Sequence, residues 1–224
     1  MKLYYHPVST TCRPILQFAA ESGISLDLQL VDLFKGEHLQ PAYCAVNPSA
    51  CVPLLEEGDF RLAECSAILK YLADLVKSPA YPAELRRRGR VNERMDWFNT
   101  GLYRDLGYGL IYPQVLPHLR MQDEQAQKAL LAASCERAKK WLGVLNDHIV
   151  GSATFVCGEE ITLADYLGAA YLTVGEVIRL DYSAYPNVVR WLSNMKARPS
   201  WSKVNEGFYA YFVAPFKDAS FAGL

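Results

Sequence analysis

The sequence lacks both the paired cysteine spacing of a metal site and the long apolar run of a membrane segment. Its six cysteines are scattered, with no CxxC pair and no histidine at zinc-ligand spacing. We therefore expect no bound metal and no disulfide framework, but free thiols in a reducing compartment. The N-terminal letters MKLYYHP turn polar before a signal-peptide core forms, so we expect a cytoplasmic protein without a membrane partner.

A charge excess of either sign is also missing. Lys and Arg number 23 and Asp and Glu number 24, for a net charge of -1, which excludes the strong basic field that nucleic acids attract. With 51% hydrophobic and 21% charged residues, the composition excludes a disordered or fibrous chain. A length of 224 residues favours two small domains, and the expected partner is a small molecule or another protein.

The first third of the chain alternates strand and helix patterns. The letters KLYYH at 2–6 are β-rich, and the next apolar residues repeat at helical spacing up to Gly23. The leucines of 26–30 alternate with polar residues, which predicts a half-buried strand. An apolar run from Val52 leads through a Glu-Gly-Asp turn into a second short strand, and a helix follows from about Glu64. The predicted order is β-α-β-α-β-β-α over residues 1–78.

The rest of the chain has almost no strand character. Prolines at 79 and 82 mark a linker over 79–84, and residues 85–224 carry helical periods interrupted by further prolines and a glycine. We therefore predict an all-α helical bundle as the second domain. Within it, Thr162-Leu163-Ala164-Asp165 has the pattern of a capping box, which is a structural feature. The basic run at 86–90 is interpreted as a solvated helix face.

Three places in the first domain suit a zwitterionic peptide ligand. Ser9 precedes a helix, where unpaired N–H groups and the helix dipole favour an anion such as a thiolate or carboxylate. At Val52-Pro53, a cis peptide bond would offer backbone groups to an extended peptide. Glu64-Cys65 begins another helix, whose N-terminus suits a carboxylate while the acidic side chain holds an amine.

Four segments of the chain resemble cytosolic glutathione transferases of the serine type, near the theta and delta classes. They are LYYHPVSTTCRP, VDLFKGEHLQPAYCAVNP, VNERMDWFNTGLYRDLGYGLIYPQVL and CGEEITLADY. They occur in the family's order and spacing, and the resemblance extends over nearly the whole chain. The resemblance implies a thioredoxin-like N-terminal domain, an all-helical C-terminal domain, glutathione as co-substrate and a bacterial protein with a part in detoxification.

The resemblance also implies roles for individual residues. Ser9 matches the hydroxyl that donates to the glutathione sulfur, and Val52 and Pro53 match the backbone contact and the cis-proline. Glu64 with Cys65 matches the clamp on the γ-glutamyl end, and His38 matches a contact to the glycyl carboxylate. Candidates for the wall of the electrophile pocket are aromatic residues of the helical domain, namely Tyr103, Tyr108, Tyr112, Phe208, Tyr209 and Phe212.

The sequence departs from the family pattern at Cys65 and Ala50, and Thr10 distinguishes it from another class. Cys65 replaces a serine, so a weak thiol donor stands where a hydroxyl is usual. Ala50 stands where the delta pattern often has a histidine, which leaves His38 alone at the glycyl end. Thr10 stands where the bacterial beta class has a cysteine, so mixed-disulfide chemistry is not expected.

Several alternatives remain open at this point. Each residue has a structural interpretation: Ser9 as an N-cap, His38 as a solvated loop residue and Glu64 as a first-turn carboxylate. A dehalogenase, peroxidase or isomerase would share the same thiol activation, and a non-catalytic binding or structural protein would share the fold. The family also implies a homodimer, with Phe60 and the region of Asp96 and Asn99 facing the partner.

Overall fold

The computed structural model describes residues 1–224, and its only sheet lies within the first 63 residues. The strands are β1 (Lys2–Tyr5), β2 (Asp27–Leu30), β3 (Leu54–Glu57) and β4 (Phe60–Ala63), in the spatial order β2-β1-β3-β4. β1 pairs with β2 in parallel, whereas β3 is antiparallel to both β1 and β4. Gly58 adopts a φ of 62° in the β3–β4 turn, a value that glycine reaches without steric cost.

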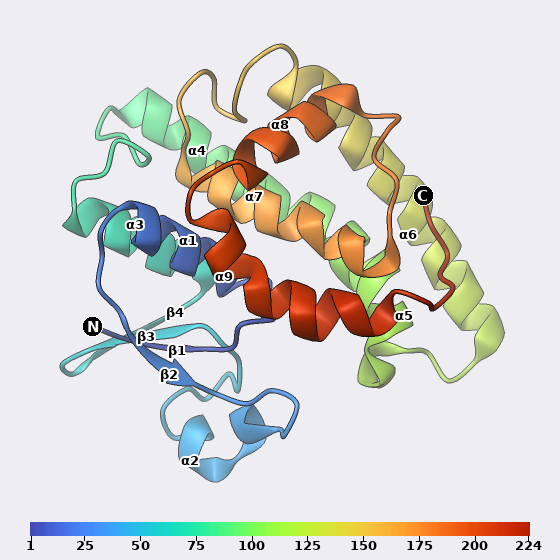
Figure 1. Cartoon of the computed structure of the whole chain (residues 1–224), viewed down its shortest axis with the longest axis horizontal. Helices are drawn as coiled ribbons and strands as arrows, with labels where there is room; N and C mark the ends of the chain where they lie inside the picture. The colour runs from blue at the N-terminus through green and yellow to red at the C-terminus, as the bar shows by residue number, and fades with distance from the viewer.

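Three helices accompany the sheet. They are α1 (Arg13–Glu21), α2 (Pro41–Cys44) and α3 (Cys65–Leu75). Figure 1 shows α1 and α3 above the strands and α2 below them. Parallel strands need a crossover connection, and α1 supplies it between β1 and β2. The predicted order β-α-β-α-β-β-α and the thioredoxin-like arrangement are confirmed.

The prediction that the second strand is half-buried is wrong. All four residues of β2 are exposed, and Leu28 and Leu30 retain 46% and 49% of their accessible surface. The physical reason is that β2 lies at the edge of the sheet, where only β1 is bonded to it. Alternation of leucine with polar residues indicates a strand but not whether another element covers its apolar face.

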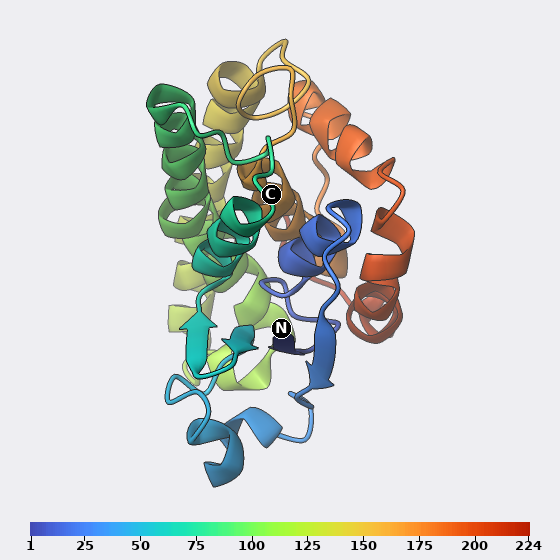
Figure 2. The same ribbon diagram turned by 90° about the vertical axis from the view of Figure 1, so that its left-hand side faces the viewer.

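The remainder of the chain is helical, as predicted. Its α-helices are α4 (Leu85–Trp97), α5 (Tyr112–Val115), α6 (Glu124–Val144), α7 (Leu163–Thr173), α8 (Pro186–Lys196) and α9 (Trp201–Phe208). Wide π-type turns over 98–102 and 104–111 continue α4 towards α5, and similar turns over 209–213 extend α9. In Figure 2 these helices stand above and beside the sheet. None of them combines the length and apolarity that crossing a bilayer requires.

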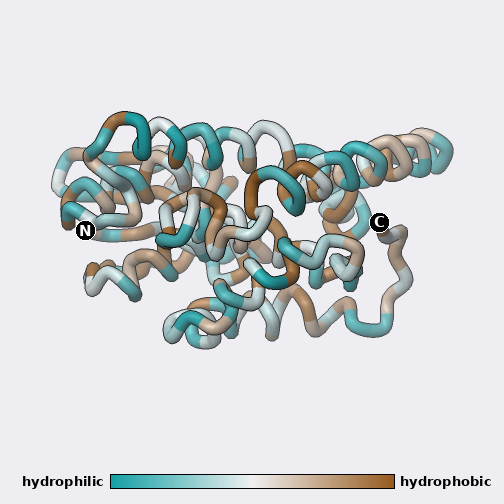
Figure 3. Tube along the Cα trace, turned by 90° about the horizontal axis from the view of Figure 1, so that it is seen from above, coloured by the Kyte–Doolittle hydropathy of each residue, from teal (hydrophilic) through white to brown (hydrophobic).

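One hydrophobic core joins the two parts of the chain. A cluster of 47 buried residues includes Leu3 and Phe18 from the first part and Phe98, Trp191 and Phe208 from the second. α1 packs against both α7 and α9. Figure 3 shows hydrophilic positions alternating with hydrophobic ones along the peripheral helices, as expected for helices with one buried face. The division into domains 1–78 and 85–224 with a linker at 79–84 stays a prediction.

Asp165 holds together the start of α7 at the centre of the helical part. Its buried carboxylate accepts hydrogen bonds from the backbone N–H groups of Val156 and Thr162, both at 2.8 Å. The Thr162 hydroxyl at 2.9 Å and the Trp191 indole N–H at 2.9 Å complete the set. The capping box predicted from the sequence is therefore present, and the same carboxylate also ties α7 to α8.

We predict that Asp165→Asn destabilises the fold. An amide offers one oxygen in place of two, and each buried donor left without an acceptor costs roughly 1–3 kcal/mol. The midpoint of urea unfolding at pH 7 should fall clearly. The surface variant Asp181→Asn is the control, because that exposed carboxylate accepts only from Ser183. Equal midpoints for Asp165→Asn and the wild type would contradict the prediction.

The same group gives stability a pH dependence. Burial raises the pKa of the Asp165 carboxyl from 3.8 to about 6. Between these values the folded chain binds a proton that the unfolded chain releases, so this group makes the free energy of unfolding decrease as the pH rises. The Asp165→Asn variant should lack this component of the slope.

Candidate functional site

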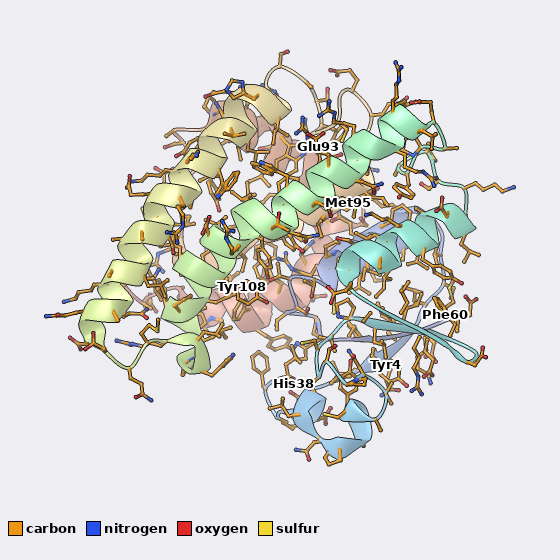
Figure 4. All side chains as sticks on the ribbon, turned by 180° about the vertical axis from the view of Figure 1, so that it is seen from behind. Tyr4, His38, Phe60, Glu93, Met95 and Tyr108 are labelled. Atoms are coloured by element: carbon orange, nitrogen blue, oxygen red, sulfur yellow. The ribbon has the colours of Figure 1, made fainter.

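A cavity of about 530 Å³ lies where the first part of the chain meets the helical part. Its walls come from the loop 8–11 before α1, from residues in 33–38, from 50–52, from the helical segment 103–119 and from Phe212. Figure 4 labels His38 and Tyr108, which approach the cavity from the two parts of the chain. The lining is mostly hydrophobic, with a few hydroxyl and imidazole groups, as is typical of small-molecule sites.

Ser9 lies in this wall, directly before α1. Its hydroxyl oxygen accepts a hydrogen bond from the backbone N–H of Cys12 at 3.3 Å, and its carbonyl accepts from the N–H of Arg13 at 3.2 Å. The Ser9 and Thr11 hydroxyl oxygens are 3.1 Å apart. Since its oxygen accepts from the backbone, the Ser9 hydroxyl can give its own proton to Thr11 or to a ligand.

Thr11 connects the Ser9 loop to the residues that precede β3. Its hydroxyl donates to the Val52 carbonyl at 3.2 Å, so it accepts rather than donates in the pair with Ser9. The Val52–Pro53 peptide bond is cis, as the resemblance implied. Val52 lines the cavity, whereas the buried Pro53 is not among the lining residues.

His38 also lines the cavity. It belongs to the short 3-10 turn Glu37–Leu39, which follows Gly36 at a φ of 71°. The His38 Nδ1 atom is buried and has no hydrogen-bond partner within the chain. A buried nitrogen is not that of a freely solvated loop side chain, so His38 is partly packed into the wall of the cavity.

Glu64 and Cys65 lie at the start of α3, outside the residues that line the cavity. Glu64 is exposed, adopts a φ of 69°, and no side chain caps the N-terminus of α3. The Cys65 side chain is only 5% exposed and belongs to the hydrophobic core, and burial raises the pKa of its thiol well above 9.0. Any contact with a ligand anion therefore rests mainly on the helix N-terminus.

Cys12 is fully buried beside Ser9. Burial raises the pKa of its thiol to about 11, which keeps it protonated at neutral pH. A protonated, inaccessible thiol is no nucleophile. This environment is that of a core residue, so Cys12 has a structural role.

Four of the six predicted electrophile-wall residues line the cavity: Tyr103, Tyr108, Tyr112 and Phe212. Tyr108 is 55% exposed and packs edge-on against the other two tyrosine rings, with centroids 5.3 Å and 5.2 Å away. The aromatic part of the wall therefore consists of three clustered tyrosines from the segment 103–112 and of Phe212 from the C-terminal region.

The assignment of Phe208 and Tyr209 to this wall is not supported, since neither lines the cavity. Phe208 is completely buried, and the Arg13 guanidinium lies 3.8 Å from the centre of its ring. Phe208 is therefore a core residue that packs against a buried cation. Phe212, one helical turn later, is the residue of this region that reaches the cavity.

Sequence reasoning missed other parts of the wall. Thr10, Thr11, Phe34 and Cys51 line the cavity, as does the segment 116–119 that follows α5. Thr10 and Thr11 were adjacent to a predicted site residue, which is the signal that points to them. No local sequence pattern marks residues 116–119, because they reach the cavity wall only through the way the chain turns after α5.

Comparison with known families identifies the family and the fold. Residues 1–74 match the family described as "Glutathione S-transferase, N-terminal domain", and residues 110–199 match "Glutathione S-transferase, C-terminal domain". The chain belongs to the glutathione S-transferase family. It is 33% identical over 201 residues to glutathione S-transferase theta-1 of Homo sapiens, and the match covers 88% of this chain and 82% of the human protein. Theta-1 of Mus musculus is 34% identical over the same shares.

Solved structures of the family have the same fold. Human glutathione S-transferase T1-1 in its apo form superposes with a TM-score of 0.82 at 30% identity, covering 99% of this chain and 92% of that one. A delta-class glutathione transferase of Nilaparvata lugens gives a TM-score of 0.79 at 34% identity, with 96% and 98% covered. These relatives indicate that the glutathione S-transferase described here is an enzyme.

Proposed function

We propose that the chain joins the sulfur of glutathione to an electrophilic carbon of hydrophobic co-substrates, with Ser9 as the group that stabilises the glutathione thiolate. The observation that carries this proposal is the position of the Ser9 hydroxyl on the cavity wall, at the entrance to α1. The theta-class relatives and the apolar lining support a transferase with a hydrophobic co-substrate.

Glutathione would lie along the loops of the first part of the chain. The backbone at Val52 suits the cysteinyl unit, and the uncapped N-terminus of α3 at Glu64 and Cys65 suits the γ-glutamyl carboxylate. The Glu64 carboxylate is exposed and free of intramolecular partners that would compete for the ligand's amine. The place of His38 in the cavity wall supports a contact at the glycyl end. Ala50, where the delta pattern often has histidine, adds no polar group there.

These groups can lower the pKa of the glutathione thiol by the amount that ionisation at neutral pH requires. A free thiol has a pKa of about 8.5, and lowering it by two units takes roughly 2.7 kcal/mol of differential stabilisation. A hydroxyl donor to an anion contributes roughly 1.5–3 kcal/mol, and a nearby helix N-terminus contributes some tenths more. The thiolate then attacks the electrophile, which the aromatic wall holds beside it, and proximity adds to the rate.

Transfer is favoured over the other functions that the sequence left open. A dehalogenase, peroxidase or isomerase would use the same thiolate, but no feature of the cavity selects one of these reactions. A non-catalytic protein with this fold would explain Cys65 and Ala50, yet it would not need a cavity that joins Ser9 to an aromatic wall. A cytoplasmic location, a part in detoxification and a bacterial source stay predictions.

We extend the proposal to a homodimer. Phe60 on β4 is 44% exposed, packs against Tyr71 with ring centroids 5.4 Å apart, and is available to a second copy. Asp96 is exposed, whereas Asn99 bonds Ser66 and Tyr171 within the chain. Light scattering at micromolar concentration should give about twice the chain mass, and Phe60→Glu should lower it. A wild-type protein of single-chain mass would contradict this.

The sharpest test of the proposed function is Ser9→Ala. We expect turnover to fall roughly 100-fold or more, as it does when one oxyanion donor is removed elsewhere. Glutathione affinity should stay nearly unchanged, because peptide binding rests on Val52, Glu64 and the start of α3. Turnover with saturating glutathione and calorimetric titration measure the two effects separately.

The matched control is Ser22→Ala at the other end of α1, which should keep wild-type turnover. If Ser9→Ala keeps full turnover while Thr11→Val abolishes it, the activating hydroxyl is not that of Ser9.

A further inference from the structure

The ionisable side chains that line the cavity include bases but no carboxylate. Two histidines, His38 and His118, belong to the lining, whereas no aspartate, glutamate, lysine or arginine does. The other titratable groups of the wall are Cys51 and the three tyrosines of the segment 103–112. Near neutral pH, the wall groups that readily become charged are therefore imidazoles, which become positive. An anionic ligand meets no like charge in this wall.

The two histidines come from different parts of the chain. His38 belongs to the turn Glu37–Leu39 of the first part, and His118 belongs to the 3-10 turn Pro117–Leu119 that follows α5. Figure 4 shows His38 below the helical segment that carries Tyr108. In the proposed function, His38 contacts the glycyl carboxylate of glutathione. His118 therefore remains for the second substrate, because it lies on the side of the cavity that the helical part forms.

The turn that carries His118 is held in place from both sides. The Gln127 side chain accepts a hydrogen bond from the Met121 N–H at 3.0 Å and donates one to the Pro113 carbonyl at 3.1 Å. Pro117 restricts the backbone directly before the histidine. The His118 side chain itself is exposed while it lines the cavity. An imidazole in this position can donate an N–H to a ligand carboxylate.

Arg13 adds a buried positive charge behind the wall. Its guanidinium is 1% exposed and bonds only neutral oxygens, on Thr173 at 3.1 Å, Asn205 at 2.8 Å and Ala170 at 2.8 Å. Burial lowers the pKa of Arg13 to about 10, so the group stays charged at neutral pH. Its charge acts on the cavity, because it opposes the rise in the pKa of Tyr112 that burial causes. Negative charge in the cavity is favoured.

One carboxylate near the cavity acts in the opposite sense. Burial raises the pKa of Tyr108, and the charges of Cys51 and Glu64 add to that rise. Glu64 lies outside the lining, and in the proposed function it binds the amine of glutathione. Its charge is then balanced by the bound ligand. The second substrate therefore enters a site in which His118 and Arg13 determine the sign of the potential.

We propose that His118 selects aromatic electrophiles that carry a carboxylate remote from the reacting carbon, by donating an N–H to that carboxylate; this rests on the proposed function. In a benzyl chloride of this class, the glutathione sulfur forms a bond to the benzylic carbon, and the carbon–chlorine bond breaks with its electron pair on chloride. The carboxylate takes no part in these bond changes. His118 therefore contributes to binding of the electrophile and not to the chemical step.

The test compares three benzyl chlorides at saturating glutathione and pH 6.5: the unsubstituted compound, its para-carboxylate and its para-trimethylammoniomethyl derivative. Each kcat/KM is divided by the rate of the uncatalysed reaction with glutathione. For the wild type, the carboxylate should give the highest ratio and the cation the lowest. His118→Phe should lower kcat/KM of the carboxylate about tenfold, because a hydrogen bond to a charge is lost. The change should appear in KM, and the unsubstituted compound should be almost unaffected.

Two further variants separate the charge of His118 from its packing. His118→Lys keeps a cation at this position and should keep the preference for the carboxylate. His148→Phe is the matched control, because His148 is exposed in the turns 145–150 and does not line the cavity. This variant should keep all three wild-type ratios. The proposal is overturned if the wild type does not prefer the carboxylate, or if His118→Phe leaves that preference unchanged. Loss of the preference in His118→Lys would also overturn it.

Failure of the proposed function gives a different pattern. If the wild type conjugates none of the three compounds, or if Ser9→Ala leaves every rate intact, thiol activation by Ser9 is refuted. The His118 contact is then measured without turnover, by calorimetric titration with S-benzylglutathione and its para-carboxylate. The wild type should bind the carboxylate more tightly, and His118→Phe should abolish the difference. Equal affinities of the wild type for the two compounds would overturn the inference about His118.

Discussion

The position of the active-site loop depends on one buried side chain, Arg13. It follows Ser9 by four residues at the start of α1, and its guanidinium reaches across to α7 and α9. Because the Ser9 carbonyl accepts the Arg13 N–H at 3.2 Å, the loop and the anchored helix move as one unit. Together with the bonds from the Cys12 N–H to Ser9, this contact fixes the Ser9 hydroxyl relative to the helical part that carries the aromatic wall.

The anchor has an energetic consequence for the site. Removing a guanidinium from water is costly, and neutral oxygens and the ring of Phe208 compensate it only in part. The remaining positive potential acts on groups nearby, among them Tyr112. The same residue thus couples the fold to the chemistry: it joins the two parts of the chain, and it favours negative charge in the wall between them.

Much of the fold could be predicted from local patterns, whereas long-range pairings could not. Periodicity, Gly58 and the prolines near 80 were sufficient for the order of strands and helices, and Ser9 was identified because it precedes a helix. The exposure of Leu28 depends on which element covers β2, and no local pattern encodes that. Phe208 and Phe212 are one helical turn apart, so the sequence did not distinguish the core ring from the cavity ring. The bond between Thr10 and Tyr112 joins residues 102 positions apart.

The proposed function requires the protein to lower the pKa of the glutathione thiol where Ser9 meets α1. Its most direct test is a pH titration of the ultraviolet thiolate absorbance of glutathione bound to the wild-type protein, with free glutathione as reference. We predict half-ionisation of the bound thiol about two pH units below the free value of about 8.5. Half-ionisation at the free value, with glutathione bound, would contradict it.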